Sequence, residues 1–159
     1  MTAARPADTS ISVATDADLP RLMAVWEASV RATHHFLSEE DLAVIIPAAH
    51  RELASISPIH CLRDANGSVY ALMSTAGEKI EMLFVAPTHL GIGAGRRLVE
   101  YAIKELGASE VEVNEQNHEA VRFYEHLGFK TFHRDAVDPQ GLPFPILHMR
   151  VGGPPRREL

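Results

Sequence analysis

Apolar residues recur along this chain with two different periods, and the two periods predict strands and helices in mixed order. Short apolar runs, alternating or continuous, predict strands. Asn66-Gly67 favours a tight turn between two of these runs and so predicts a β-hairpin. The predicted strands cover residues 11–14, 59–63, 69–74, 79–85, 109–113, 129–132 and 145–151.

Apolar stripes with helical spacing predict four helices among these strands. Asp16 or Asp18 is a candidate N-cap of the first helix. Pro47 predicts a kink or a break within the second helix, because proline has no N–H and clashes with the preceding turn. The predicted helices run from the first cap to about residue 30, then over 38–53, 93–106 and 117–127. This order of elements indicates an α/β protein.

Length and composition predict one domain over 10–151, between a flexible lead-in at 1–9 and a flexible tail at 152–159. No apolar run approaches the ~20 residues that span a bilayer, and the first residues lack the apolar core of a signal peptide, so we expect a cytoplasmic protein without a membrane partner. The net charge of −6 argues against nonspecific nucleic-acid binding. The single Cys61 excludes an internal disulfide and a multi-cysteine zinc site.

A glycine-rich segment joins the strand at 79–85 to the helix at 93–106. Gly91, Gly93 and Gly95 let the backbone turn tightly and approach a ligand closely. The first N–H groups of the helix have no intrahelical partner, and together with the helix dipole they attract a phosphate. Any strand-to-helix connection can carry glycine, however, so this segment alone leaves both interpretations open.

A second motif follows that helix: Asn117, Ala120, Phe123-Tyr124 and Gly128-Phe129. In order and spacing, the two motifs resemble those of the GNAT acetyltransferase superfamily. The specific resemblance covers about residues 81–129, and the order of elements extends it over nearly the whole chain. The resemblance implies the GNAT acyltransferase fold, in which helices flank a central mixed, mostly antiparallel sheet. It also implies an N-acetyltransferase with acetyl-coenzyme A (acetyl-CoA) as cosubstrate.

The resemblance implies a role for each segment. The loop amides hold the pyrophosphate of acetyl-CoA, the main chain of the preceding strand lies beside the pantetheine and acetyl groups, and Asn117 contacts the cofactor or caps its helix. Tyr124 is implied to protonate the departing sulfur, and its alternative role is helix packing. The residues implied to bind the cofactor are Leu83, Phe84, Val85, Leu90, Gly91, Ile92, Gly93, Ala94, Gly95, Arg96, Asn117 and Tyr124.

One loop position departs from the family pattern. The family usually has Arg or Gln where this chain has Leu90, and a leucine side chain cannot donate a hydrogen bond to phosphate. Arg96 lies nearby, either as a compensating phosphate ligand or as a solvated residue in the first turn of the helix. We therefore expect cofactor binding to be retained in a weakened form.

Neither motif supplies the general base. Glu81 precedes Leu83 by two residues, so strand alternation predicts that both share one sheet face, near the amine; the alternative is a solvent-facing residue. His34 and His35 are further candidates, because histidine titrates near neutrality and this connection borders the acceptor site in the resembled family. Adjacent histidines rarely converge on a metal, so no metal site is predicted. The other histidines, including His133, show no distinguishing spacing.

The leading interpretation is therefore an N-acetyltransferase whose acceptor is a primary amine of a small molecule or of a peptide or protein side chain. The alternative is a noncatalytic acyl-CoA sensor or binding module. Leu90 and the unassigned base favour the sensor, whereas Tyr124 disfavours it, because a binding module needs no proton donor beside the sulfur. The last strand could also pair across a homodimer.

Overall fold

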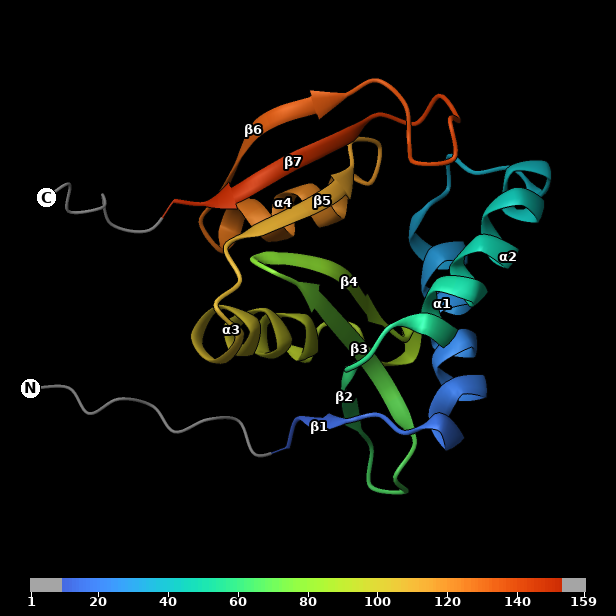
Figure 1. Ribbon diagram of the computed structural model, residues 1–159, viewed down its shortest axis with the longest axis vertical. Coiled ribbons are helices and arrows are strands. Elements are labelled where there is room, and N and C mark those ends of the chain that lie inside the picture. Colours follow the sequence, from blue (N-terminus) through green and yellow to red (C-terminus); the bar gives the residue numbers. More distant parts are fainter. Residues whose placement is uncertain (1–9, 153–159) are drawn as a thin grey trace, which may run out of the picture.

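The computed structural model describes residues 10–152 (Figure 1). The predicted lead-in at 1–9, and the predicted tail beyond Gly152, lie outside the described residues. The strands are β1 (Ser12–Val13), β2 (His60–Arg63), β3 (Val69–Ala76), β4 (Lys79–Val85), β5 (Glu110–Asn114), β6 (Phe129–Asp135) and β7 (Ile146–Val151). The helices are α1 (Leu19–Thr33), α2 (Glu39–Ser55), α3 (Ala94–Leu106) and α4 (His118–His126), with 3₁₀ turns at Asp16–Asp18 and Pro87–His89. None of the helices in this range is long and apolar enough to cross a membrane.

The strands form one seven-stranded sheet in the order β1-β2-β3-β4-β5-β7-β6. Neighbouring strands pair antiparallel except β4 and β5, which pair parallel. The hairpin predicted around Asn66-Gly67 is confirmed as β2 and β3. β7 lies between β5 and β6, so the expectation that the last strand pairs across a homodimer is wrong: both of its edges are already paired, and β6 is the edge strand.

The first two helices extend beyond their predicted ends. α1 reaches Thr33, and α2 continues through Pro47 to Ser55, so the proline does not break the helix. Asp18 stands at the N-cap position of α1, but its carboxylate makes no cap hydrogen bond there. It accepts the backbone N–H of Thr15 instead.

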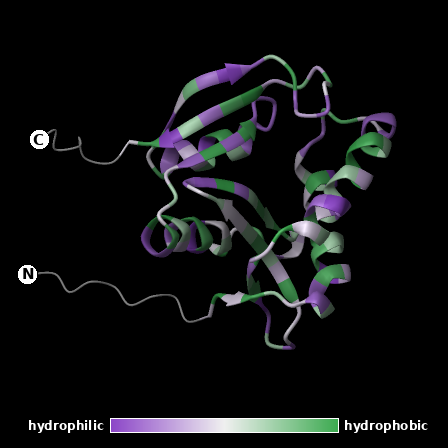
Figure 2. Ribbon diagram, viewed as in Figure 1, coloured by the Kyte–Doolittle hydropathy of each residue, from purple (hydrophilic) through white to green (hydrophobic). Residues whose placement is uncertain are grey.

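Helices cover both faces of the sheet. The Trp26 ring of α1 meets the Phe84 ring of β4 edge-on, with centroids 6.2 Å apart. The next residue, Val85, adjoins the start of α3 near Gly95, and successive strand residues point to opposite faces. Figure 2 shows hydrophobic and hydrophilic residues interleaved along the helices, as expected for helices with one buried side.

The parallel pair β4 and β5 separates soon after it begins. Only Lys79 and Ile80 of β4 have partners on β5, namely Glu110 and Val111. Beyond Ile80 the two strands part, and the edge of β4 that faces β5 has no strand partner there. The sheet therefore leaves main-chain groups of β4 accessible at its centre.

Asp18 and Arg63 tie the start of α1 to the β2–β3 hairpin. The Arg63 guanidinium donates to both oxygens of Asp18, at 2.9 and 2.8 Å, and holds the pKa of that carboxyl well below its usual range. Because the folded-state pKa is lowered, this pair stabilises the fold above about pH 4 and loses its effect as the pH falls further.

We expect Asp18→Asn to lower the free energy of unfolding by about 1 kcal/mol at pH 7, since the pair is partly solvent-exposed. The difference from the wild type should be smaller at pH 2, because the carboxyl of the unfolded chain is protonated there while Arg63 still holds the folded-state pKa lower. Urea denaturation at the two pH values measures both. An equal loss at both would mean that the side chain acts by packing and not by charge.

Candidate active site

A cleft opens where β4 and β5 part, with a cavity volume of about 690 Å³. Its walls come from these strands, the glycine loop, the first turn of α3, α4 and the end of α1. The predicted site residues that line it are His34, Glu81, Leu83, Phe84, Val85, Leu90, Gly91, Gly93, Ala94, Gly95, Arg96, Asn117 and Tyr124. Ile92 and His35 are exposed outside this lining.

The glycine loop presents main-chain N–H groups to the cleft. Gly91 and Gly93 have φ angles of 81° and 84°, a left-handed conformation that side chains strongly disfavour. Gly93 is the N-cap residue of α3, and no side chain caps this helix. Its first N–H groups and the positive end of its dipole therefore lie at the cleft. This arrangement favours binding of an anion.

Gly95 lets α3 and α4 come together at the cleft. A Cβ atom at this position would lie 3.2 Å from the ring of Phe123, which is closer than nearly all such contacts in proteins. The side chains beside the loop contribute little buried charge. Leu90 is 56% exposed, and the Arg96 guanidinium is exposed and pairs with Glu100 at 3.1 Å. The main chain thus dominates the anion-binding end of the cleft.

Tyr124 and Asn117 reach the cleft from α4. The Tyr124 ring is 5% exposed and packs edge-on against Phe123 and Phe129, so Tyr124 does pack in the core. Burial raises the pKa of the Tyr124 phenol, which keeps it protonated. Within residues 10–152 its hydroxyl has no hydrogen-bond partner, which leaves that proton for a group in the cleft. Asn117 accepts the N–H of Ala120 at 3.2 Å, so it also caps α4.

Glu81 lies at an irregularity in β4. The residues on its two sides pair with consecutive residues of β3, which leaves Glu81 as an extra residue in the ladder. Glu81 and Leu83 both line the cleft despite this irregularity. Glu81 is also exposed and not buried, although it does line the cleft.

Three carboxylates gather at this end of the cleft. Lys79 lies 3.7 Å from Glu81 and 2.6 Å from Glu112, which also lines the cleft. The pKa of the Glu52 carboxyl on α2 is raised, first by burial and second by the nearby negative charge of Glu81. Lys79 thus pairs with two of the three acidic side chains, and the local potential is negative.

The two adjacent histidines have different surroundings. His34 lines the cleft, and burial, aided by neighbouring His35, lowers the pKa of its imidazole to about 4. Its expected titration near neutrality is therefore wrong, because the buried ring disfavours the charged form. His35 is exposed.

A smaller pocket of about 160 Å³ adjoins the cleft and shares His34 and Phe84 with it. The loop at 136–145 closes this pocket, and its Phe144 ring lies 5.5 Å from the ring of Phe36 in the connection between α1 and α2. Asp138 is buried in the same loop, where one carboxylate oxygen accepts backbone N–H groups of the loop. The sequence pattern itself predicts only a turn at Pro139-Gln140-Gly141 in this segment.

Glu112 and the 136–145 loop are the parts of the site that sequence reasoning missed. A signal for Glu112 was available in the sequence. It stands between two apolar residues of a predicted strand, so its side chain lies on the opposite face of the strand from theirs. The loop had no such signal. Its place beside the α1–α2 connection depends on tertiary packing.

The cleft combines three chemical features along its length: main-chain donors for an anion, a protonated phenol without a hydrogen-bond partner among residues 10–152, and a group of carboxylates. The unpaired edge of β4 lies between the first and the last of these. Such a site suits transfer of a group from a phosphate-bearing carrier to a cationic acceptor, with the phenol as proton donor to the leaving group.

Comparison with known proteins gives a consistent result. A family model described as an acetyltransferase (GNAT) domain matches residues 31–151. The chain is 36% identical over 132 residues to a peptidyl-lysine N-acetyltransferase, YjaB, of Escherichia coli K12, covering 83% of this chain and 89% of that protein. Its counterpart in Salmonella typhimurium LT2 is 35% identical over 136 residues, covering 81% and 88%.

Solved structures agree on the fold. The apo-form solution structure of Escherichia coli YjaB superposes with a TM-score of 0.82 at 34% identity, covering 91% of this chain and 98% of that one. A PaiA N-acetyltransferase from Thermoplasma acidophilum, solved in complex with coenzyme A, has a TM-score of 0.66 at 19% identity over 89% and 99% of the two chains, a likeness of fold alone.

The predicted α/β fold, with a mixed, mostly antiparallel sheet flanked by helices, is confirmed. The family match covers most of the chain and includes both sequence motifs. The chain therefore belongs to the GNAT acetyltransferase family and is an N-acetyltransferase that takes its acyl group from an acyl-coenzyme A.

Proposed function

We propose that this enzyme transfers an acetyl group from acetyl-CoA to the side-chain amine of a lysine in a peptide or protein. The observation that best supports the proposal is the cluster of three carboxylates at one end of the cleft, which we call the acceptor end. Glu81 and Glu112 line the cleft, and Glu52 lies near Glu81. A lysine ammonium is attracted to this negative end and can lose its proton there.

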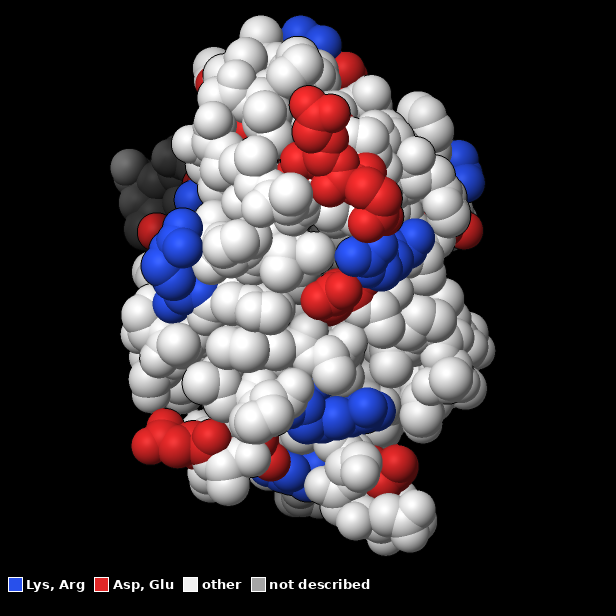
Figure 3. Space-filling view, turned by 90° about the vertical axis from the view of Figure 1, so that its right-hand side faces the viewer, with Lys and Arg blue, Asp and Glu red and all other residues white. Residues whose placement is uncertain are grey.

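A second acidic surface, at the start of α2, also suits a cationic peptide. Figure 3 shows the side of the molecule that carries α1 and α2, with a group of acidic side chains beside a basic one. α2 begins with Glu39, Glu40 and Asp41, and Arg31 pairs with Glu27 and Glu39. The name of both relatives, peptidyl-lysine N-acetyltransferase, supports the same acceptor.

For the donor, we propose that the coenzyme pyrophosphate binds the N–H groups of residues 90–96 and that the thioester lies along the unpaired edge of β4. The main-chain N–H near Leu83 would then stabilise the oxyanion that develops on the thioester oxygen. This arrangement is supported by the uncapped start of α3 and by the parting of β4 from β5.

The proposed reaction is a direct transfer. The neutral amine nitrogen attacks the thioester carbon, the new C–N bond forms, and the C–S bond breaks. Tyr124 gives its proton to the departing sulfur, and the nitrogen loses a proton to a base through water. Among the three candidate bases we assign this role to Glu81, since it lines the cleft in contact with solvent whereas His34 binds protons weakly and His35 is outside.

The acceptor is tested by measuring free coenzyme A release from acetyl-CoA. We expect a peptide with one lysine to give a kcat/KM at least about 10-fold above that of the same peptide with the lysine acetylated, and above that of small amines such as spermidine. A small amine that matched or exceeded the peptide would overturn the assignment of the acceptor. Faster release from a longer acyl-CoA would overturn the assignment of the donor.

Glu81→Gln is expected to erase the acidic limb of the pH profile of kcat/KM, because that limb reports protonation of the base in the free enzyme. Coenzyme binding should be unchanged. His35→Gln is the matched control, since it alters a candidate outside the cleft, and His34→Gln is compared in the same series. If all three variants keep the wild-type profile, the base is a different residue or a solvent relay.

Leu90→Arg is expected to tighten coenzyme A binding by about 5- to 100-fold. The position lines the cleft and is exposed, so an arginine there can reach the pyrophosphate and form a charge-assisted hydrogen bond of about 1–3 kcal/mol. Calorimetric titration with coenzyme A measures the gain, and Ile92→Arg, outside the cleft, serves as the control. Equal gains in both variants would point to general charge and not to a specific contact.

A further inference from the structure

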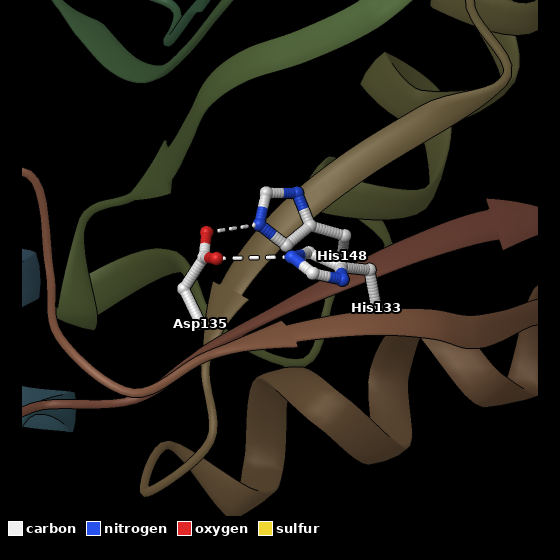
Figure 4. Close-up of side chains that lie close together, drawn as sticks. All are labelled: His133, Asp135 and His148. Atoms are coloured by element: carbon white, nitrogen blue, oxygen red, sulfur yellow. Dashed lines mark hydrogen bonds and ion pairs between the residues drawn. The ribbon is translucent and has the colours of Figure 1, made fainter.

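Two histidines and an aspartate meet on β6 and β7, outside the cleft (Figure 4). His133 Nε2 lies 3.0 Å from one carboxylate oxygen of Asp135, and His148 Nε2 lies 2.7 Å from the other. His133 and His148 are paired across the two strands, and their ring centroids are 5.0 Å apart. All three potential ligand atoms lie within 4.8 Å of one another.

We propose that His133, Asp135 and His148 bind one divalent transition-metal ion of the zinc class. Two imidazole nitrogens and a carboxylate oxygen are typical ligands of Zn²⁺ when three protein ligands leave a position for water. Ligand atoms bound at about 2.0–2.1 Å in a tetrahedral site lie about 3.3 Å from each other. The N–O distances of 3.0 and 2.7 Å run to different oxygens of Asp135, and the three ligand atoms lie within 4.8 Å of one another, so the carboxylate has to turn and the rings have to shift to admit the ion.

The second nitrogen of His148 has a suitable partner for this role. Its Nδ1 lies 3.4 Å from Glu112 Oε2, while its Nε2 faces the centre of the cluster. A histidine that binds a metal through Nε2 carries its proton on Nδ1, and a carboxylate that accepts this proton fixes the ring and makes it a stronger ligand. Glu112 is itself held by Lys79 at 2.6 Å. The cluster therefore has a carboxylate beside the second nitrogen of one histidine as well as three potential ligands.

The cluster is open to solvent. The side chains of His133 and Asp135 are 58% and 50% exposed, whereas His148 is 20% exposed. An ion can therefore enter from water, and water molecules can complete its coordination. Metal ions of the zinc class bind imidazole nitrogen without needing a thiolate ligand. Hard cations such as Mg²⁺ are disfavoured, because two of the three ligands are imidazoles.

The proposal is independent of the acceptor and donor assigned above, and binding of the metal itself tests it. The protein is first treated with a chelator and then titrated with Zn²⁺ in competition with a zinc-responsive dye. We expect one equivalent to bind to the wild type and the affinity to fall at least about 10-fold in His133→Gln, Asp135→Asn and His148→Gln. His126→Gln is the matched control, because it removes an exposed histidine on α4.

A second measurement does not depend on the stability of the variants. One equivalent of Co²⁺ added to the wild type should broaden or shift the imidazole NMR signals of His133 and His148 before those of His126. Wild-type affinity in the three cluster variants, an equal loss in His126→Gln, or imidazole signals that respond alike would each overturn the proposal.

Discussion

Tyr124→Phe is expected to lower turnover by about 10- to 1000-fold while coenzyme A binding stays nearly unchanged, the range typical of losing one acid catalyst and its hydrogen bond. The substitution removes only the hydroxyl. The ring contacts with Phe123 and Phe129 can persist, so the fold should tolerate it. Because burial raises the pKa of this phenol, the wild-type hydroxyl keeps its proton at neutral pH.

The matched control is Tyr101→Phe, which removes a tyrosine hydroxyl from α3 outside the cleft lining. Coenzyme A release is measured with a working acceptor, and coenzyme binding is measured separately by titration. Wild-type turnover in Tyr124→Phe would make Tyr124 a packing residue and leave protonation of the sulfur to water. A matching loss of binding in that variant would mean that its hydroxyl holds the coenzyme and does not act on the leaving group.

The sequence was sufficient wherever local features decide the structure. The glycines that adopt positive φ, the uncapped helix start that follows them and the packing helix with Tyr124 are each set by residues close together in the chain. For this reason the residues predicted at the glycine loop do line the cleft. Ile92 is the exception, because a residue between two glycines of a turn can point either into the cleft or out to solvent.

The acceptor end was harder to predict because tertiary pairing determines it. The irregularity at Glu81 could not be predicted, since it exists only through the register of β4 against β3. Burial separates His34 from His35, although the two are neighbours in sequence and share one residue type. Neither effect leaves a mark in the local pattern of apolar and polar residues.

The His133, Asp135 and His148 cluster shows the same limit. The sequence pattern marks only the beginning of this strand, at 129–132, whereas β6 continues to Asp135 with an irregularity after Thr131. That irregularity sets which β6 residues face His148 across the pair. Two histidines separated by 15 positions come together only through this register, so their spacing alone could not distinguish His133 from the other histidines.

Replacement of Gly95 by valine is expected to abolish the stabilisation that coenzyme A gives to the wild type. A Cβ atom at this position meets the Phe123 ring at 3.2 Å, and the larger side chain forces α3 and α4 apart just where the first N–H groups of α3 face the cleft. Gly93→Val should act differently but with the same result, because its φ of 84° cannot be kept by a β-branched residue.

The measured quantity is the change in melting temperature on adding coenzyme A, and not the melting temperature itself, since each substitution also destabilises the free protein. At a ligand concentration 100 times Kd, mass action stabilises the wild type by about 2.7 kcal/mol, which is roughly 5–11 °C for a chain of this size. Gly77→Val is the matched control: its φ of 59° imposes similar backbone strain in the β3–β4 turn, away from the cleft. We expect Gly77→Val to melt at a lower temperature and to keep the full coenzyme-induced shift. A full shift in both Gly93→Val and Gly95→Val would remove the pyrophosphate from this loop and place the donor elsewhere.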